Sequence, residues 1–211
     1  MRERRDGRRV WAGGALLAAG VIVVVLFGGC LSKPPVADTP PPSGGGRWLD
    51  APLKNWNAPK AQVPGAPAPI SLWPDDASCS RNVRSPRTTE DYAVRAAGWY
   101  LVGSAYSDKD TSLIRANTSV DGMCRPLGYQ VFVFVDGVFA GTLSPVPMHS
   151  RADGALVRVD PLDDNNLVAR YSRYAANDPL CCPSRTSTVT FRVDHSIPLV
   201  TPVTVSTERG Q

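Results

Sequence analysis

The alternation of apolar and polar positions is clearest between residues 129 and 143, which read YQVFVFVDGVFAGTL. Two runs of β-branched and aromatic residues flank Asp136-Gly137, a dipeptide that tolerates positive φ in a two-residue hairpin turn. The first run is apolar on both faces, with Val131, Val133 and Val135 on one and Phe132 and Phe134 on the other. Because a strand buried on both faces is central in its sheet, the pattern predicts a central β-hairpin covered on each face by a helix or a second layer.

The remaining elements follow from shorter patterns. Thr88 can cap a short helix that has Glu90 and Asp91 in its first turn and ends at Gly98. A strand is expected to begin at Trp99, and further strands are predicted over 155–159, 167–174 and 188–193. Asp160-Pro161 and the cluster at 163–166 have the composition of turns. The sequence therefore predicts an α+β single domain, with one short helix packed on an antiparallel β-sheet that contains the hairpin.

The N-terminus has the order of a secretory signal. Five arginines precede an uncharged stretch from Val10 to Gly29, and Gly28-Gly29 stands before Cys30. This arrangement is similar to a lipobox, in which the cysteine is acylated and becomes the new N-terminus, so Cys30 is the predicted lipidation site. The alternative is an uncleaved transmembrane helix, because twenty helical residues span roughly 30 Å. In both cases the positive-inside rule places everything after Cys30 on the extracytoplasmic side of the cell membrane.

Composition divides the rest of the chain. Residues 1–29 are the predicted signal peptide, 30–78 an anchored tether rich in proline and glycine, 79–195 the α+β domain and 196–211 a C-terminal tail. Proline withholds a donor and fixes φ, so the tether is expected to be extended. Its tryptophans, Trp48, Trp56 and Trp73, have two interpretations: they fill grooves on the domain, or they form a strap that binds a partner.

Charge excludes one class of partner. The chain has a formal net charge of +4, of which residues 1–29 carry +3 through five arginines and two acids. The mature protein therefore keeps about one net charge and has no basic surface that would bind nucleic acid.

Four cysteines remain for the domain: Cys79, Cys124, Cys181 and Cys182. An even number in an oxidising compartment predicts two disulfides, for which three pairings are possible. Because a ring closed by adjacent cysteines strains the peptide bond between them, Cys181 and Cys182 are each expected to reach back to Cys79 or Cys124. Zinc is the alternative, but the chain has no C-x-x-C and only two histidines, so neither a metal nor another cofactor is expected.

Three segments resemble a known family. GMCRPLGYQVFVFVDGVFAGTLSP (122–145), MHSRADG (148–154) and RYAANDPLCCPS (173–184) resemble the LppP/LprE family of bacterial lipoproteins. The resemblance spans about residues 92–194, and Cys-Cys-Pro-Ser after Asp-Pro is its most specific part. It implies a lipoprotein with a single domain and transfers no catalytic residue.

An enzymatic activity is not expected. The chain lacks G-x-S-x-G, and its histidines, His149 and His195, lie in predicted loops. The acids near Asp163 lack the alternation of a calcium loop. A possible ligand surface is formed by Arg170, Tyr171, Arg173 and Tyr174, since arginine beside tyrosine can hold an anionic head group; ordinary cross-strand pairing is the other explanation.

Two functions are therefore compared. The first is a lipid-anchored lipoprotein of the cell envelope whose domain binds a protein, glycan or lipid of the cell surface. The second is a carrier of a lipid or small molecule, which requires an apolar cavity of several hundred Å³ between the helix and the sheet.

Overall fold

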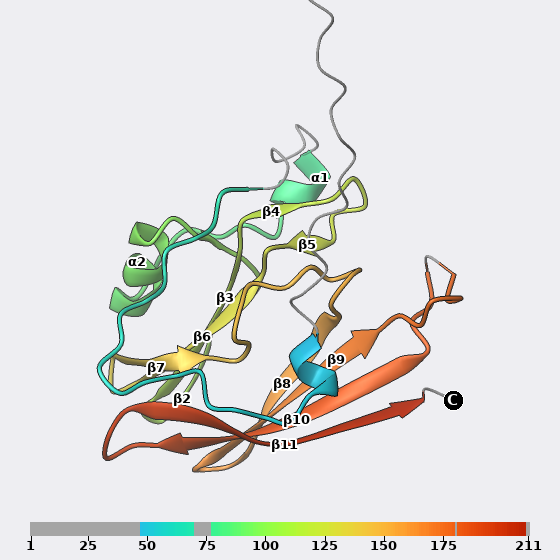
Figure 1. The fold of residues 1–211 in the computed structure, drawn as a ribbon. Helices are drawn as coiled ribbons and strands as arrows, with labels where there is room; N and C mark the ends of the chain where they lie inside the picture. The colour runs from blue at the N-terminus through green and yellow to red at the C-terminus, as the bar shows by residue number, and fades with distance from the viewer. Residues whose placement is uncertain (1–46, 70–76, 180, 210–211) are drawn as a thin grey trace, which may run out of the picture. The chain divides into compact units, whose positions relative to one another are not determined.

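Two antiparallel β-sheets pack face to face, and a short helix covers the outer face of the first (Figure 1). The computed structural model describes residues 47–69, 77–179 and 181–209. Cys30 and Trp73 lie outside these residues. The fold is thus mostly β, with the predicted short helix, but it has two large sheets where the sequence predicted one.

The first sheet has the strand order β1-β3-β6-β7, and β2 also pairs with β3. Its strands are β1 (Tyr100–Leu101), β2 (Tyr106–Asp108), β3 (Thr111–Asn117), β6 (Gln130–Val135) and β7 (Val138–Thr142). The predicted hairpin is confirmed: β6 is buried along its whole length and pairs with β3 and β7. Asp136 and Gly137 occupy the turn with φ of 48° and 75°.

The second sheet has the order β11-β10-β9-β8. Its strands are β8 (Ala155–Asp163), β9 (Asn166–Arg173), β10 (Arg185–Asp194) and β11 (Leu199–Arg209), while β4 (Ser119–Val120) and β5 (Pro126–Leu127) form a separate small ladder. The predicted turn at 163–166 is confirmed, with Asp164 and Asn165 between β8 and β9, but Asp160-Pro161 lies within β8. The expected C-terminal tail instead contains β11, which pairs with β10 along its length.

The apolar core lies on both sides of β6. Its valines face the second sheet, where Tyr171, Val189 and Phe191 are fully buried. Its phenylalanines face the other way and pack with Val94 and Trp99. The prediction that a helix or a second layer covers each face of this strand is confirmed.

Helix α2 (Thr89–Ala96) forms where its sequence predicted. The Thr88 side chain accepts a hydrogen bond from Asp91 N, and Gly98 ends the helix with a φ of 95°. Asp91 is buried and forms a two-point ion pair with Arg84. Burial raises the pKa of Asp91, but the hydrogen bonds from Arg84 and from Arg87 N outweigh it and hold this pKa below its usual range.

Residues 47–69, expected to be part of the tether, pack against both sheets; we call them the strap. The strap begins with a 3-10 helix, η1 (Arg47–Asp50), and runs past β10 and β7 to α2 (Figure 1). Leu49 is buried, and the Trp48 and Trp56 rings lie edge-on to each other, 5.1 Å apart. These side chains fill the groove beside the second sheet, which is the first of the two predicted interpretations.

The cysteine pairing differs from the expectation. Cys79, in the one-turn helix α1 (Ala77–Ser80), pairs with Cys124, and Cys181 pairs with its neighbour Cys182. All four are therefore bridged, but the prediction that Cys181 and Cys182 reach back to the other two was wrong. Chain topology is the reason: α1 lies beside the β4–β5 loop, so Cys79 and Cys124 are satisfied by each other.

Candidate functional site

A cavity of about 260 Å³ opens between the two sheets, beside the Cys79–Cys124 bridge. Strand residues that line it include Arg115, Asn117, Gln130, Val131, Ala155 and Leu156. It lies between sheet and sheet, and not between helix and sheet as the carrier hypothesis supposed. Its volume is below the roughly 300–1,000 Å³ of sites for drug-sized ligands, so it fits a smaller molecule.

Strand β3 contributes two polar residues, Arg115 and Asn117, to the lining of this space. Successive side chains of a strand alternate between its faces, so Leu113, Arg115 and Asn117 share one face. Leu113 belongs to the core between the sheets and pairs with Val133. Arg115 and Asn117 lie on the same face of β3, past the end of the apolar core that contains Leu113. At this point the two sheets enclose the cavity.

Asn117 is the unusual residue of the site. It is 1% exposed, and neither its Nδ2 nor its Oδ1 has a hydrogen-bond partner. A buried polar group without a partner costs about 1–3 kcal/mol, and most such groups in native proteins are satisfied. Asn117 therefore presents both a donor and an acceptor that nothing in the described part of the chain uses.

Arg115 gives the cavity its charge. The residue is half-buried, and within the described ranges its side chain forms no hydrogen bond and no ion pair. The described residues that line the cavity include no Asp or Glu. The one fixed charge at the cavity is thus the Arg115 guanidinium, which offers several donors in a planar arrangement.

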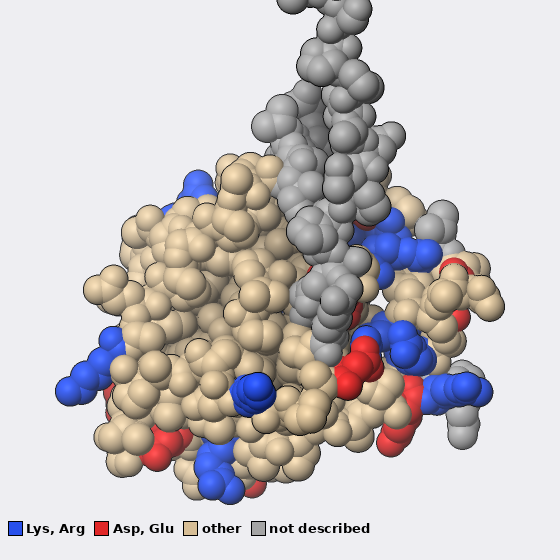
Figure 2. Space-filling model, viewed as in Figure 1, with Lys and Arg blue, Asp and Glu red and all other residues tan. Residues whose placement is uncertain are grey.

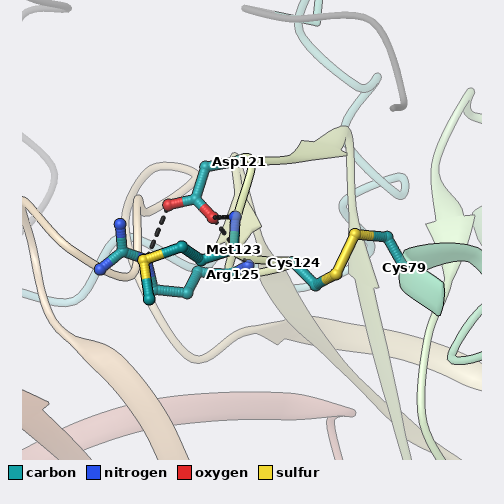
Figure 3. The surroundings of a disulfide bond; sticks show 5 residues. All are labelled: Cys79, Asp121, Met123, Cys124 and Arg125. Atoms are coloured by element: carbon teal, nitrogen blue, oxygen red, sulfur yellow. Dashed lines mark hydrogen bonds and ion pairs between the residues drawn. A yellow bond between two sulfur atoms is a disulfide. The ribbon is translucent and has the colours of Figure 1, made fainter. Parts of the chain in front are cut away.

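The Cys79–Cys124 disulfide and Val120 of the adjoining loop line one side of the cavity. Figure 3 shows the disulfide and the hydrogen bonds of this loop. Asp121 holds the loop by accepting hydrogen bonds from Met123 N, Arg125 N and Arg125 Nε. Burial raises the pKa of Asp121, but these hydrogen bonds outweigh it, so the pKa lies below its usual range. The carboxylate stays ionised and engaged, and Cys124 adopts a φ of 59° that is uncommon outside glycine.

Tyr129 closes the floor of the cavity. Its hydroxyl is buried and donates to Gly154 O, while its backbone pairs with Met148. Burial raises the pKa of Tyr129 well above its usual value, so the phenol stays neutral. A neutral hydroxyl that already donates to a backbone carbonyl is a packing group and does not supply a proton.

The four residues of the predicted ligand surface do not lie on one surface. Tyr171 is buried, and its hydroxyl donates to Leu143 O, 2.9 Å away. Arg173 is buried as well and pairs with Asp50 of the strap. Arg170 lies exposed on the other face of β9, and Tyr174 stacks with Arg151. Side chains of β9 alternate between its faces, and the strap covers the face that holds Tyr171 and Arg173.

The histidines have structural partners. His149 Nδ1 accepts a hydrogen bond from Gly128 N, and His195 lies between the Asp110 carboxylate and Asp164 O, 2.9 Å from each. Within 47–69, 77–179 and 181–209, no three His, Cys, Asp or Glu side chains gather as they would around a metal ion.

The charged surface is mixed. On the face shown in Figure 2, basic and acidic side chains lie near one another around the rim, and they do not form one basic area. Several form local pairs, such as Lys109 with Asp164 and Arg158 with Asp160.

Sequence reasoning did not find the cavity. The β3 segment TSLIRAN mixes polar and apolar residues and was not predicted to be a strand. A usable signal was nonetheless present, because Leu113, Arg115 and Asn117 recur at the strand period with an apolar residue leading into polar ones. The wall opposite comes from β8, about 40 residues later, and only the tertiary fold brings the two together.

Residues 107–196 match the family model described as LppP/LprE lipoprotein. The match runs from β2 through β10, and so includes Arg115, Asn117 and the Cys181–Cys182 pair. Comparison with curated proteins and with solved structures finds no match. Among the helices in the described part of the chain, none is long and apolar enough to cross a membrane.

Proposed function

We propose that this protein, whose residues 107–196 match the LppP/LprE lipoprotein family model, is a lipoprotein anchored through Cys30 at the extracytoplasmic side of the cell membrane. We also propose that its domain binds a small ligand without catalysing a reaction. The observation that carries the binding proposal is the buried Asn117 amide, which lines a cavity and has no partner. Family membership supports the lipoprotein part.

The anchor rests on the sequence around Cys30. An uncharged segment that ends in Gly28-Gly29-Cys30 suits cleavage and acylation, whereas a transmembrane helix gives no reason for a cysteine at this point. In cells, Cys30→Ala should leave an uncleaved precursor, and an inhibitor of the lipoprotein signal peptidase should cause the wild-type precursor to accumulate. Normal maturation in both experiments would show that the segment is a retained transmembrane helix.

A binding role explains a feature that packing alone does not. An apolar residue at position 117 would fill the same space without the cost of an unpaired amide. The Arg115 guanidinium, on the same stretch of β3, lines the same cavity and has no partner within the described ranges. Two unpartnered polar side chains at one cavity are expected for a site whose polar groups are satisfied by a ligand.

The test is native mass spectrometry of the full chain extracted from its own envelope in mild detergent. A small molecule bound in the cavity should appear as a non-covalent adduct of defined mass. Ala155→Phe, which places a ring in the cavity, should remove the adduct, whereas Val157→Phe on the same strand but outside the cavity should keep it. Wild-type protein without any adduct, or an adduct that survives Ala155→Phe, would contradict the proposal.

A second candidate is a partner-binding groove on the strap. Trp48, Leu53, Trp56 and Pro145 line an open, apolar hollow of about 470 Å³, and Trp48 Nε1 is buried without a partner. Tryptophans are frequent anchors of protein interfaces, so an envelope protein is the partner that this groove suggests. A photo-crosslinker at Leu53 should then yield one defined adduct in intact cells, which a crosslinker at Lys60, exposed on the strap and outside the hollow, should yield less efficiently.

A further inference from the structure

The ligand class can be derived from two of the polar side chains that line the cavity, Arg115 and Asn117. We infer that the cavity takes a small amphipathic carboxylate with a second hydrogen-bonding group, its carboxylate on Arg115 and its second group on Asn117. This inference rests on the proposed function and deepens it, because it names the chemistry of the molecule that the cavity would bind.

The sign of the ligand charge follows from Arg115. Its guanidinium is the one charge among the described lining residues and has no described partner. The neighbouring cations are already neutralised, since Arg125 pairs with Asp121 and Arg84 pairs with Asp91. An anion therefore gains a charge-assisted interaction at Arg115, while a cation meets only repulsion. A planar carboxylate suits the planar guanidinium, because two parallel hydrogen bonds can form.

The second group follows from Asn117. Its amide offers one acceptor oxygen and a donor nitrogen, and both lack partners. A hydroxyl or an amide on the ligand can use both atoms, whereas a plain alkyl chain can use neither. Arg115 and Asn117 are two residues apart on β3, so their Cα atoms are about 6.6–6.8 Å apart. This spacing suits a head group in which the carboxylate and the second polar group lie a few bonds apart.

The apolar part of the ligand follows from the other walls. Val102, Val120 and Leu156 line the cavity together with the Cys79–Cys124 bridge. These groups offer contact and no hydrogen bond, so they favour a hydrocarbon or aromatic body. The body must be small, because the whole cavity is about 260 Å³.

The experiment uses the full chain in lipid nanodiscs and two probes of equal size, N-acetylphenylalanine and its neutral primary amide. Both carry an acetamide group and an aromatic body, and they differ in the carboxylate alone. We expect calorimetric titration, with empty nanodiscs as the blank, to show that the acid binds at least about tenfold more tightly than the amide. This is the difference in affinity that one hydrogen bond to a charged group provides. Arg115→Gln should remove this preference, and Arg115→Lys should restore part of it.

Asn117 provides an independent readout. Asn117→Leu should raise the melting temperature of the ligand-free protein, because it removes an unpaired buried amide. The same variant should weaken binding of the acid about fivefold or more, since the second group loses its partner. A purely structural role for Asn117 would instead lower the melting temperature, and this result would overturn the inference.

The outcomes separate this inference from the proposed function. Equal binding of the acid and the amide, lost from both in Ala155→Phe, would show that the cavity binds ligands but does not select an anion. Absence of binding by either probe, or binding that Ala155→Phe leaves unchanged, would overturn the inference. The proposed function would still be tested separately, by native mass spectrometry of the protein extracted from its own envelope.

Discussion

The side-chain amide of Asn57 holds the backbone of Thr142 on both sides. Thr142 N donates to Asn57 Oδ1 at 2.9 Å, and Asn57 Nδ2 donates to Thr142 O at 3.0 Å. Asn57 Nδ2 also donates to Val200 O, 2.9 Å away. The strap residue thus joins β7, an edge strand of the first sheet, to β11, an edge strand of the second.

Loss of this amide should therefore loosen the contact between the sheets. Asn57→Ala removes three hydrogen bonds to the backbone, at a net value of about 1 kcal/mol for each. Thr142 O keeps its hydrogen bond from Trp56 Nε1, while Thr142 N and Val200 O lose their side-chain partner. We expect the free energy of unfolding to fall by about 2–3 kcal/mol. Lys54→Ala, an exposed change in the same strap, should alter it by less than about 0.5 kcal/mol. Denaturant melts that show equal losses for the two variants would mean that the strap does not stabilise the sheets.

The strap also shows what the sequence could not predict. Its prolines indicated an extended chain, and the described part contains the 3-10 helix η1 and no strand of its own. Whether such a chain lies in solvent or on the domain depends on partners that come more than 80 residues later, such as Thr142 and Phe191. The three tryptophans were the only local sign, and they allowed both interpretations.

Local elements were predictable, and long-range ones were not. The hairpin at Asp136-Gly137 and the helix capped by Thr88 are encoded by neighbouring residues, and both were predicted. Strand β11 was not, because its exposed threonines, serine and glutamate lack a continuous apolar face. The cavity and the Cys79–Cys124 pair depend on which strands meet in the fold, so neither could be derived from spacing alone.

The ion pair between Asp50 and Arg173 should make the strap sensitive to acid. The hydrogen bond from Arg173 holds the pKa of Asp50 below its usual range. Because the pKa is lower in the folded protein, the pair stabilises the fold above the unfolded pKa, and this stabilisation is lost as pH falls through the folded pKa. Asp50→Asn should be less stable than wild type near neutral pH, and the difference should shrink in the acid range below the usual carboxylate pKa. A difference that is constant with pH would rule out this ionic contribution.

The two disulfides should contribute very differently to stability. Cys79 and Cys124 are 45 residues apart, so their bridge restricts a long loop of the unfolded chain, while Cys181 and Cys182 are adjacent. Replacing Cys79 and Cys124 by serine should lower the free energy of unfolding by about 4 kcal/mol in the chain-entropy model.

The matched control is the replacement of Cys181 and Cys182 by serine, which removes no long loop and should change this free energy much less. Peptide mapping without reduction should recover Cys79 linked to Cys124 and no cross-link from either to residue 181 or 182. A peptide that joins Cys181 or Cys182 to one of the other two would show that the pairing is different.

The hairpin connects the local sequence to the whole fold. Phe134 is buried and lies 5.6 Å from Phe139, ring centre to ring centre. Phe134→Ala should open a cavity beneath α2 and lower the free energy of unfolding by about 3–5 kcal/mol. Val138→Ala, at a half-exposed position of the same hairpin, should cost much less.

A substitution at Gly137 in the turn measures the cost of backbone strain separately from the cost of lost packing. A Cβ added at Gly137 would lie 3.6 Å from Glu90 Oε1, an ordinary contact, so space is available. The φ of 75° is nonetheless a region that β-branched residues avoid, and Gly137→Val should cost about 1–3 kcal/mol for this reason alone. Export and acylation should survive both changes, since they depend on residues 1–30. If Phe134→Ala left the denaturation midpoint unmoved, β6 would not be the central buried strand.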